Sequence, residues 1–188
     1  MHEMIAITPL GGATAQIDSF SSVEISEQPD WALASVTARH GQTEAVKEAA
    51  INLMGISLPD VGDVTAGPEM TAFWIGPDQW MIEADHAQHE RLAAKLKAGF
   101  ANSASVTEQT DGWARFDVDG SKAVEMFERL CPLDARAMAT DRVSRSSIEH
   151  LVCFVVCRNA GQHFSVFCPR SAAASLHHTL CTAAQSLS

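Results

Sequence analysis

The segment at residues 73–83 constrains the fold of this chain more than any other. It contains Trp74 and Trp80, two of the four tryptophans, on either side of a Gly-Pro-Asp turn at residues 76–78. The flanking runs are alternating or apolar, which predicts two antiparallel strands joined by a tight turn. The segment holds no obvious catalytic group. A tryptophan-rich hairpin without chemistry is typical of a hydrophobic core or of a docking surface.

Strand-like and helix-like segments alternate around this hairpin. Residues 32–38 are apolar and β-branched, which predicts a strand. Residues 42–54 carry apolar side chains at helical spacing, and Gly55 provides a typical stop after them. A further helix is expected after Asp85, because this residue can cap a helix N-terminus and Gln88 follows at the capping-box spacing.

The second half of the chain repeats this scheme. A Thr-Asp-Gly turn at residues 110–112 separates two strand-like runs at 105–109 and 113–118, which predicts a second hairpin. Residues 121–131 place apolar side chains on one helical stripe. The remaining segments are two strand-like runs and a helix with a serine cap, at residues 151–157, at residues 163–168 and from Ser171 onward.

Hairpins with helices inserted between them predict an α+β fold, with largely antiparallel sheets and helices on one face. Because both halves show a similar order of elements, we expect duplicated half-domains. Residues 1–30 show no sustained period and are expected to form an N-terminal arm. Residues 31–188 then form a single domain of two halves, at about 31–103 and 104–188.

The composition is that of an ordinary globular protein with an acidic excess. The 188 residues are 46% hydrophobic, and the formal net charge is −10 with 13 basic residues. Such a chain repels phosphate backbones, so nucleic-acid binding is disfavoured. The sequence shows no basic amphipathic helix, signal peptide or membrane-spanning apolar run, so no membrane role is expected. Five irregularly spaced cysteines favour reduced thiols and a cytoplasmic location.

No motif for a bound cofactor is recognisable in the sequence. The glycine pair at residues 11–12 lacks the spacing of a dinucleotide site. Cys153 and Cys157 lie about 13 Å apart along one strand, so they cannot share a zinc ion. His177 and His178 point roughly 100° apart on a helix, so they do not form a metal clamp. We therefore expect no catalytic, cofactor-binding or metal-binding residue in this chain.

Two further arrangements have both a chemical and a structural interpretation. Cys157 would face His163 in a symmetric hairpin, which would make a thiol–imidazole dyad, although a core thiol beside a hydrogen-bonded histidine is the commoner arrangement. Arg115 and Asp117 alternate with apolar neighbours, so we expect them on the polar face of a half-buried strand. Nothing specific points to an acid–base pair among the carboxylates near this strand, which include Asp111.

The tryptophans are the remaining signal, since the chain has four of them and no tyrosine. They either fill a core or anchor a partner, because tryptophan and arginine carry much of the binding energy at protein interfaces. We interpret five residues as a candidate partner interface: Trp74, Trp80, Trp113, Arg115 and Arg170.

Six short segments occur in a characteristic order and spacing. They are Gly55-Ile56-Ser57-Leu58-Pro59, Trp74-Ile75-Gly76-Pro77-Asp78-Gln79-Trp80, Gln109-Thr110-Asp111-Gly112-Trp113-Ala114-Arg115-Phe116, Leu130-Cys131-Pro132-Leu133-Asp134, Ile148-Glu149-His150-Leu151 and Pro169-Arg170-Ser171. In these segments the chain resembles the gamma subunit of heterotetrameric sarcosine oxidase, from about Trp31 to the C-terminal helix. Residues 118–121 and the helix after them also resemble the folate-binding domain of aminomethyltransferases, which is a duplicated α+β unit.

The resemblance implies an accessory subunit without a catalytic site of its own. The family's complex oxidatively demethylates sarcosine to glycine, with release of peroxide and transfer of a one-carbon unit to tetrahydrofolate. In that family the alpha and beta subunits carry FAD, FMN, NAD and the folate site, and the delta subunit holds zinc. This chain would then dock chiefly on alpha within a complex of alpha, beta and delta subunits, and isolated chains would be able to form a homo-oligomer.

The alternative is a stand-alone folate-binding or aminomethyltransferase-like protein. A folate site needs a carboxylate that hydrogen-bonds the pterin edge and an apolar slot for its ring. Asp111, Asp117 and Glu149 are the candidate carboxylates, with Trp113 as a candidate ring contact.

Overall fold

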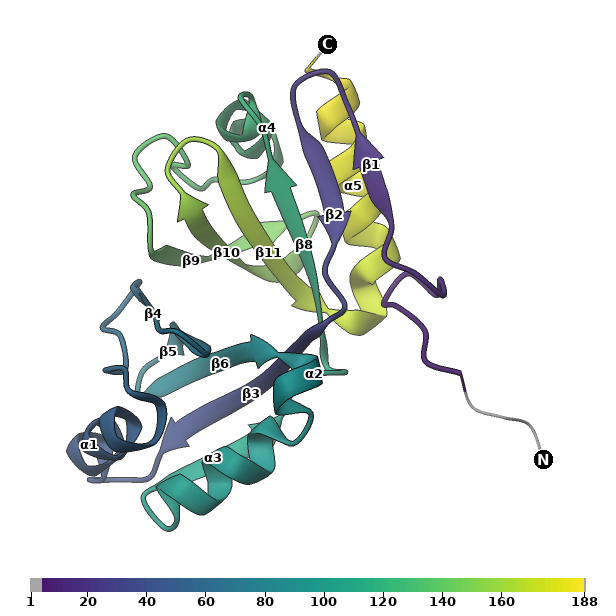
Figure 1. Cartoon of the computed structure of the whole chain (residues 1–188). Coiled ribbons are helices and arrows are strands. Elements are labelled where there is room, and N and C mark those ends of the chain that lie inside the picture. The colour runs from purple at the N-terminus through teal and green to yellow at the C-terminus, as the bar shows by residue number, and fades with distance from the viewer. Residues whose placement is uncertain (1–4, 188) are drawn as a thin grey trace. The chain divides into compact units, whose positions relative to one another are not determined.

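The computed structural model describes residues 5–187, which fold into two antiparallel sheets with helices packed against them (Figure 1). The predicted α+β class is therefore confirmed. The chain separates into two compact units. Unit 1 contains the segment up to Pro29, Trp113–Thr140 and the segment from Ser144 onward, whereas unit 2 contains Asp30–Gly112 and Asp141–Val143. Residues 1–4 of the expected arm lie outside the described residues.

Unit 2 is built on a five-stranded antiparallel sheet in the order β4-β5-β6-β3-β7. Helices α1 and α3 cover one face of this sheet (Figure 1). Their buried side chains, such as Val46 and Leu96, share one apolar cluster with the central strands. The elements of unit 2 are β3 (Trp31–Ala38), α1 (Thr43–Met54), β4 (Val64–Ala66), β5 (Met70–Gly76), β6 (Gln79–Asp85), α2 (His86–His89), α3 (Leu92–Phe100) and β7 (Ala104–Glu108).

The predicted tryptophan hairpin is confirmed. Strands β5 and β6 pair in antiparallel fashion, with Trp74 opposite Trp80 and the turn at Pro77 and Asp78. Asp78 has a φ of 53°, a left-handed conformation that aspartate tolerates better than most residues do. A register shift between Trp74 and Gly76 marks a bulge where the first strand enters the turn.

Unit 1 is built on a six-stranded sheet in the order β1-β2-β8-β11-β10-β9. Helices α4 and α5 contribute to one core with this sheet, in which the rings of Phe127 and Phe164 lie 4.9 Å apart. The elements are β1 (Ile17–Ser19), β2 (Glu24–Glu27), β8 (Trp113–Asp119), α4 (Ala123–Leu130), β9 (Arg142–Ile148), β10 (Leu151–Asn159), β11 (His163–Pro169), a 3₁₀ turn (Arg170–Ala172) and α5 (Ala173–Gln185).

The two sheets share one topology. Apart from the short α2, unit 2 runs β3-α1-β4-β5-β6-α3-β7, and unit 1 runs β8-α4-β9-β10-β11-α5 in the same spatial order. In unit 2, β7 pairs with β3. In unit 1, β2 takes the corresponding place beside β8, and both pairs are antiparallel. The expected duplication is thus present in the topology, and the N-terminal segment supplies the last strand of unit 1.

The segment expected as an arm therefore contributes two strands. Strand β1 pairs with β2, and β2 pairs with β8, where Ile25 lies opposite Val118. At the end of β8 the two segments come very close. A Cβ atom on Gly120, whose φ is +145°, would lie 2.2 Å from the backbone oxygen of Ser22. Only glycine permits this approach.

The predicted hairpin at residues 105–109 and 113–118 is wrong. Strand β7 pairs with β3, whereas β8 pairs with β2 and β11. The Thr110 hydroxyl accepts a hydrogen bond of 3.0 Å from the backbone N–H of Leu33, which holds the end of β7 to the sheet of unit 2. A turn motif fixes a change of direction, but pairing follows the apolar faces of the strands. The division between units therefore falls between Gly112 and Trp113.

Candidate functional site

The five residues of the candidate interface occupy two kinds of environment. Trp80 and Arg115 are buried, with 3% and 7% of their surface exposed, so they stabilise the interior of the chain. Trp74, Trp113 and Arg170 are half-buried and keep some surface open to a partner.

Two of the half-buried residues also make contacts within unit 1. The Arg170 guanidinium donates to the backbone oxygen of Ile7 at 2.7 Å, which ties the N-terminal segment to the region after β11. The ring centroid of Trp113 lies 5.4 Å from that of Phe154. These contacts fix the two side chains in place, which lowers the entropy cost of using them in binding.

A pocket of about 210 Å³ lies beside both tryptophans of the hairpin in unit 2. The indole nitrogen of Trp80 donates to the carbonyl of Pro59 at 2.9 Å. The indole nitrogen of Trp74 is buried and has no hydrogen-bond partner among the described residues. A buried donor of this kind costs free energy until an acceptor reaches it. Lys47 and Asp60, 3.7 Å apart, add charges to the pocket lining. The pocket thus combines aromatic surface with a pair of charged side chains, which suits a docking site.

Arg115 and Asp117 form a bidentate ion pair on β8, with two nitrogen–oxygen distances of 2.9 Å. The Ser165 hydroxyl donates to the same carboxylate at 2.6 Å, and Nε2 of His163 lies 3.5 Å from it. The register of β8 against β11 causes this arrangement, because it places Ser165 opposite Asp117. The Arg115 guanidinium also lies 5.8 Å from the ring centre of Phe167, its cross-strand partner.

This environment holds Asp117 ionised. Burial alone would raise the pKa of the carboxyl, but the contacts with His163, Arg115 and Ser165 outweigh burial and hold the pKa well below its usual value. The prediction that Arg115 and Asp117 share a strand face is confirmed. Their polar neighbours Ser165 and His163 agree with a polar face, but the expectation of a half-buried strand is wrong, because both residues are buried. Both carboxylate oxygens are engaged, so Asp117 is poorly placed to accept a proton or bind a pterin edge.

The structure does not form the thiol–imidazole dyad. A register shift between Cys157 and Asn159 places Cys157 opposite Phe164, and His163 opposite Asn159. The Cys157 thiol belongs to the core of unit 1, with its sulfur 3.7 Å from the carbonyl of Met138, whereas His163 faces the buried ion pair. The strand register thus puts the thiol and the imidazole on opposite faces of the sheet.

Burial makes several other thiols poor nucleophiles. It raises the pKa of Cys153 to about 11 and that of Cys168 to about 12. Burial and then the charge of Asp18 raise the pKa of Cys181 to about 11. Because the thiolate is the reactive form, these side chains are unsuited to nucleophilic attack at neutral pH.

One cluster of metal-ligating side chains was not predicted from the sequence. Asp18, His177 and Cys181 lie together in unit 1. The sequence held one indication of this cluster: His177 and Cys181 are four residues apart, which places them on one face of a helix. Asp18 could not be assigned to that face, because β1 is too short to show a period.

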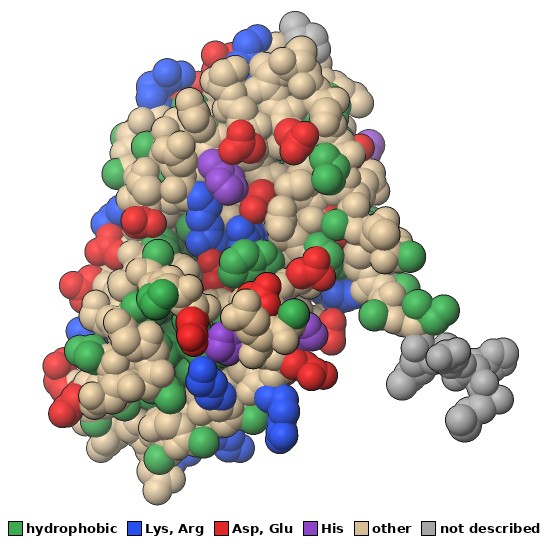
Figure 2. Space-filling view, in the orientation of Figure 1, with side chains coloured by type: hydrophobic (Ala, Val, Ile, Leu, Met, Phe, Trp, Pro, Cys, Tyr) green, Lys and Arg blue, Asp and Glu red, His purple; other side chains and the backbone are tan. Residues whose placement is uncertain are grey.

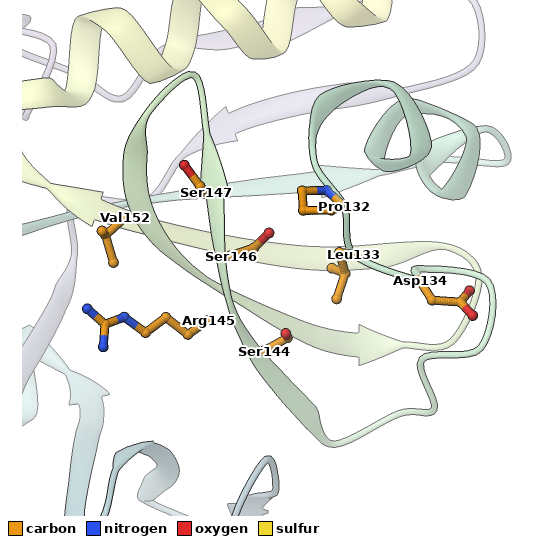
Figure 3. Close-up of a pocket in the computed structure, with 8 residues that line it drawn as sticks. All are labelled: Pro132, Leu133, Asp134, Ser144, Arg145, Ser146, Ser147 and Val152. Carbon is orange, nitrogen blue, oxygen red and sulfur yellow. The ribbon is translucent and has the colours of Figure 1, made fainter.

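A pocket of about 620 Å³ lies at the β9 edge of the six-stranded sheet (Figure 3). In this view Arg145 and Val152 lie on one side of β9, and Leu133 and Asp134 lie on the other. Val152 is an apolar side chain with 43% of its surface exposed. Strand β9 comes last in the sheet order of the described residues. Its first residues pair with Gly62 and Asp63, and beyond Val143 its outer edge presents backbone groups that another chain can pair with. The lining consists of Pro132, Leu133, Asp134, Ser144, Arg145, Ser146, Ser147 and Val152.

The surface charge agrees with the acidic composition. On the face shown in Figure 2, acidic and basic side chains are scattered, and Lys and Arg do not gather into one continuous patch. Within residues 5–187 no helix has the length and apolar character needed to cross a bilayer.

Comparison with known proteins defines the class of fold. No protein-family model matches the sequence, and no curated protein matches it significantly. Solved structures do match: the chain has an α+β fold of the aminomethyltransferase type, which is found in sarcosine oxidase and in the glycine cleavage system. The fold expected from the sequence resemblance is therefore confirmed.

Two structures carry this comparison. A chain of heterotetrameric sarcosine oxidase from Corynebacterium sp. U-96, in complex with pyrrole 2-carboxylate, matches with a TM-score of 0.76 and 19% identity, over 87% of this chain and 84% of that chain. Aminomethyltransferase T of the glycine cleavage system from Bartonella henselae matches with a TM-score of 0.69 and 14% identity. That match covers 94% of this chain but 57% of the aminomethyltransferase. At these identities the likeness establishes the fold.

Proposed function

We propose that this chain is the gamma-type accessory subunit of a cytoplasmic heterotetrameric sarcosine oxidase. The observation that carries the proposal is the match to a chain of such an enzyme over 87% of this chain and 84% of that chain. Because the two shares are nearly equal, the two chains have similar lengths.

The complex would oxidatively demethylate sarcosine to glycine, release peroxide and pass a one-carbon unit to tetrahydrofolate. Its FAD, FMN, NAD, folate and zinc would belong to the alpha, beta and delta subunits. The chemistry of this chain supports such a division. Asp117 is engaged by Arg115 and Ser165, and burial keeps the thiols of Cys153 and Cys168 protonated.

The Trp74 pocket is our proposed docking site for the alpha subunit. The half-buried side chain of Trp74 lines this pocket beside Trp80, and large aromatic side chains of this kind are common anchors at interfaces. On unit 1, Trp113 and Arg170 would provide separate contacts with a partner. Trp80 and Arg115, which are buried, would each stabilise the interior of their own unit.

Co-expression with candidate alpha, beta and delta subunits tests the proposal. We expect a four-part complex that releases peroxide when sarcosine is added, and we expect assembly or activity to collapse when this chain is left out. A three-part complex of full activity, with this chain free in solution, would contradict an accessory role.

Substitution of the anchor makes the same test specific. Trp74→Ala should weaken partner binding by about 2 kcal/mol, or roughly 30-fold, while the variant keeps its fold. Ile51→Ala is a suitable control, because Ile51 is an apolar side chain of α1 with 55% exposure and does not line the pocket. If both variants bind the partner as the unmodified chain does, Trp74 is not the anchor.

A stand-alone folate-binding protein is the second candidate, favoured by the match to aminomethyltransferase T. The proposed carboxylates fit this role poorly. Asp117 is fully engaged, and Glu149 lies in the β9–β10 turn with a φ of 46° and lines a separate pocket of about 310 Å³ beside Arg129 and His178. Asp111 is exposed in the turn after β7.

Calorimetry of the isolated chain with tetrahydrofolate distinguishes the two candidates. We expect no saturable binding. Saturable binding that Asp111→Asn or Glu149→Gln weakens would favour the stand-alone protein, particularly if the chain also fails to assemble with the sarcosine oxidase subunits.

A further inference from the structure

Three metal-ligating side chains meet where strand β1 lies beside helix α5 (Figure 1). Asp18 comes from β1, and His177 and Cys181 come from successive turns of α5. Their carboxylate oxygen, imidazole nitrogen and sulfur atoms all lie within 4.8 Å of one another. Across the part of the chain that the structure describes, these are the three donors that come together in this way.

The distances approach those of a tetrahedral metal site. Nε2 of His177 lies 2.8 Å from Oδ2 of Asp18 and 3.4 Å from Sγ of Cys181. In a tetrahedral zinc site, the bond lengths imply about 3.3 Å between nitrogen and oxygen ligands and about 3.6 Å between nitrogen and sulfur ligands. The nitrogen–oxygen pair therefore needs to open by about half an ångström, and the nitrogen–sulfur pair by less. Side-chain rotation alone provides such movements.

The surroundings hold the three donors in place. The Gln16 amide donates to both carboxylate oxygens of Asp18, at 3.3 and 3.0 Å. The imidazole of His177 packs 5.8 Å from the ring of Phe116, a fully buried side chain. The Asp18 and His177 side chains remain 30% and 16% exposed, so an ion can enter from solvent. A hydrogen bond to the carboxylate and an apolar wall beside the imidazole are typical supports of metal ligands.

The geometry argues against a catalytic triad. In a Cys-His-Asp triad the thiol and the carboxylate contact different nitrogens of the imidazole. Here Asp18 and Cys181 approach the same nitrogen, Nε2 of His177. Three donors gathered within 4.8 Å of one another suit a cation, which takes the place between them.

We propose that Asp18, His177 and Cys181 bind a zinc ion. One oxygen, one nitrogen and one sulfur donor form a mixed set that suits zinc, and three protein ligands leave the fourth tetrahedral position for water or for a donor from a partner. The thiol of Cys181 loses its proton to solvent when the ion binds. This site departs from our expectation that the chain has no metal-binding residue, and its test does not depend on the function proposed above.

Zinc at this position would fasten the N-terminal segment. Strand β1 is three residues long and pairs only with β2 in the described sheet. A bond from Asp18 through the ion to α5 would connect β1 directly to the C-terminal helix. The proposal therefore predicts that zinc protects the segment before β2 from proteolysis.

The test is a metal titration of the full chain after treatment with a chelator. We expect zinc to bind with a stoichiometry of one, measured against a chromophoric competitor. Cobalt(II) in place of zinc should give the charge-transfer absorption of a thiolate ligand. Cys181→Ser and His177→Gln should each lower zinc affinity by about 100-fold or more, and Gln16→Ala by about 10-fold.

Two controls match the ligand variants closely. His178→Gln alters the neighbouring, exposed histidine of the same helix, and Cys131→Ser alters another half-buried thiol of the same unit. Both should retain the affinity of the unmodified chain. If either ligand variant on α5 fails to fold, Asp18→Asn provides the test, because this side chain is partly exposed on a short edge strand.

Three results would overturn the proposal. They are the absence of saturable zinc binding, zinc binding that none of the ligand variants weakens, and a cobalt spectrum without a thiolate band. In any of these cases the cluster is a hydrogen-bonded tie between β1 and α5 and not a metal site.

Discussion

At the scale of single residues, the most consequential interaction is the ion pair of Arg115 and Asp117. Asp117→Asn keeps an oxygen that accepts from Ser165, but it leaves the buried Arg115 charge without its bidentate partner. Removal of one member of a buried pair costs about 3 kcal/mol or more of unfolding free energy. Urea unfolding at pH 7 should show this loss. Asp119→Asn, at an exposed position of the same strand, should change stability by less than about 0.5 kcal/mol.

The pH dependence of this pair follows from the lowered pKa of Asp117. A group whose pKa falls on folding stabilises the protein at pH values above its unfolded pKa of 3.8, and this contribution is lost as pH falls below that value. The stability difference between the unmodified chain and Asp117→Asn should therefore stay constant from pH 7 to about pH 5 and shrink by pH 3. A difference that is equal at pH 7 and pH 3 would contradict this account.

The alternation of charged and apolar residues along β8 predicted part of this interaction. The pattern of β8 correctly placed Arg115 and Asp117 on one face, because successive strand residues point to opposite sides. It did not indicate burial, since a charged pair on a strand normally faces solvent. Ser165 and His163 lie far away in sequence, so the partners that complete the network follow from the β8–β11 register.

At the scale of elements, the N-terminal segment takes the place of a missing strand in unit 1. Its Val23 and Ile25 are buried in the core, and burial of each side chain contributes about 1.5–3 kcal/mol to the free energy of unfolding. Deletion of residues 1–28 also uncovers the edge of β8. The combined loss of unfolding free energy is comparable to the total stability of a typical domain, so unit 1 should unfold or aggregate. Hydrogen exchange should show loss of protection in β8 and β11.

A shorter deletion and a peptide provide the controls. Removal of residues 1–6 should be tolerated, because Ile5 and Ala6 are exposed. A peptide of residues 15–29, added to the chain that lacks residues 1–28, should restore protection in β8. Full protection of β8 without the peptide would show that unit 1 does not need β2.

The elements that the sequence predicted well are those made by local contacts. The hairpin of β5 and β6 was evident, because a two-residue turn pairs neighbouring runs. Strands β1 and β2 are three and four residues long, which is too short to show a period. The partner of β7 was also missed, because β3 lies about seventy residues earlier in the chain.

At the scale of the whole molecule, the accessory subunit that we propose would contact several partners and would need more than one docking surface. The pocket at β9 is a second candidate beside the Trp74 pocket, since it joins an exposed apolar side chain to an open strand edge. Composition alone indicated an acidic protein without a nucleic-acid partner. It could not locate such a surface, because residues 132–134, residues 144–147 and Val152 meet only in the fold.

Val152→Glu tests this second surface. A charge at the pocket should repel an apolar partner side chain and weaken assembly at least 10-fold, whereas stability should change little because 43% of Val152 is exposed. Ile51→Glu introduces the same charge at an exposed apolar position outside the pocket and should assemble normally. Affinity for the purified partner subunits and thermal unfolding would be measured together. If Val152→Glu binds every partner as tightly as Ile51→Glu does, the β9 edge is free in the complex, and docking must use other surfaces, among them the Trp74 pocket.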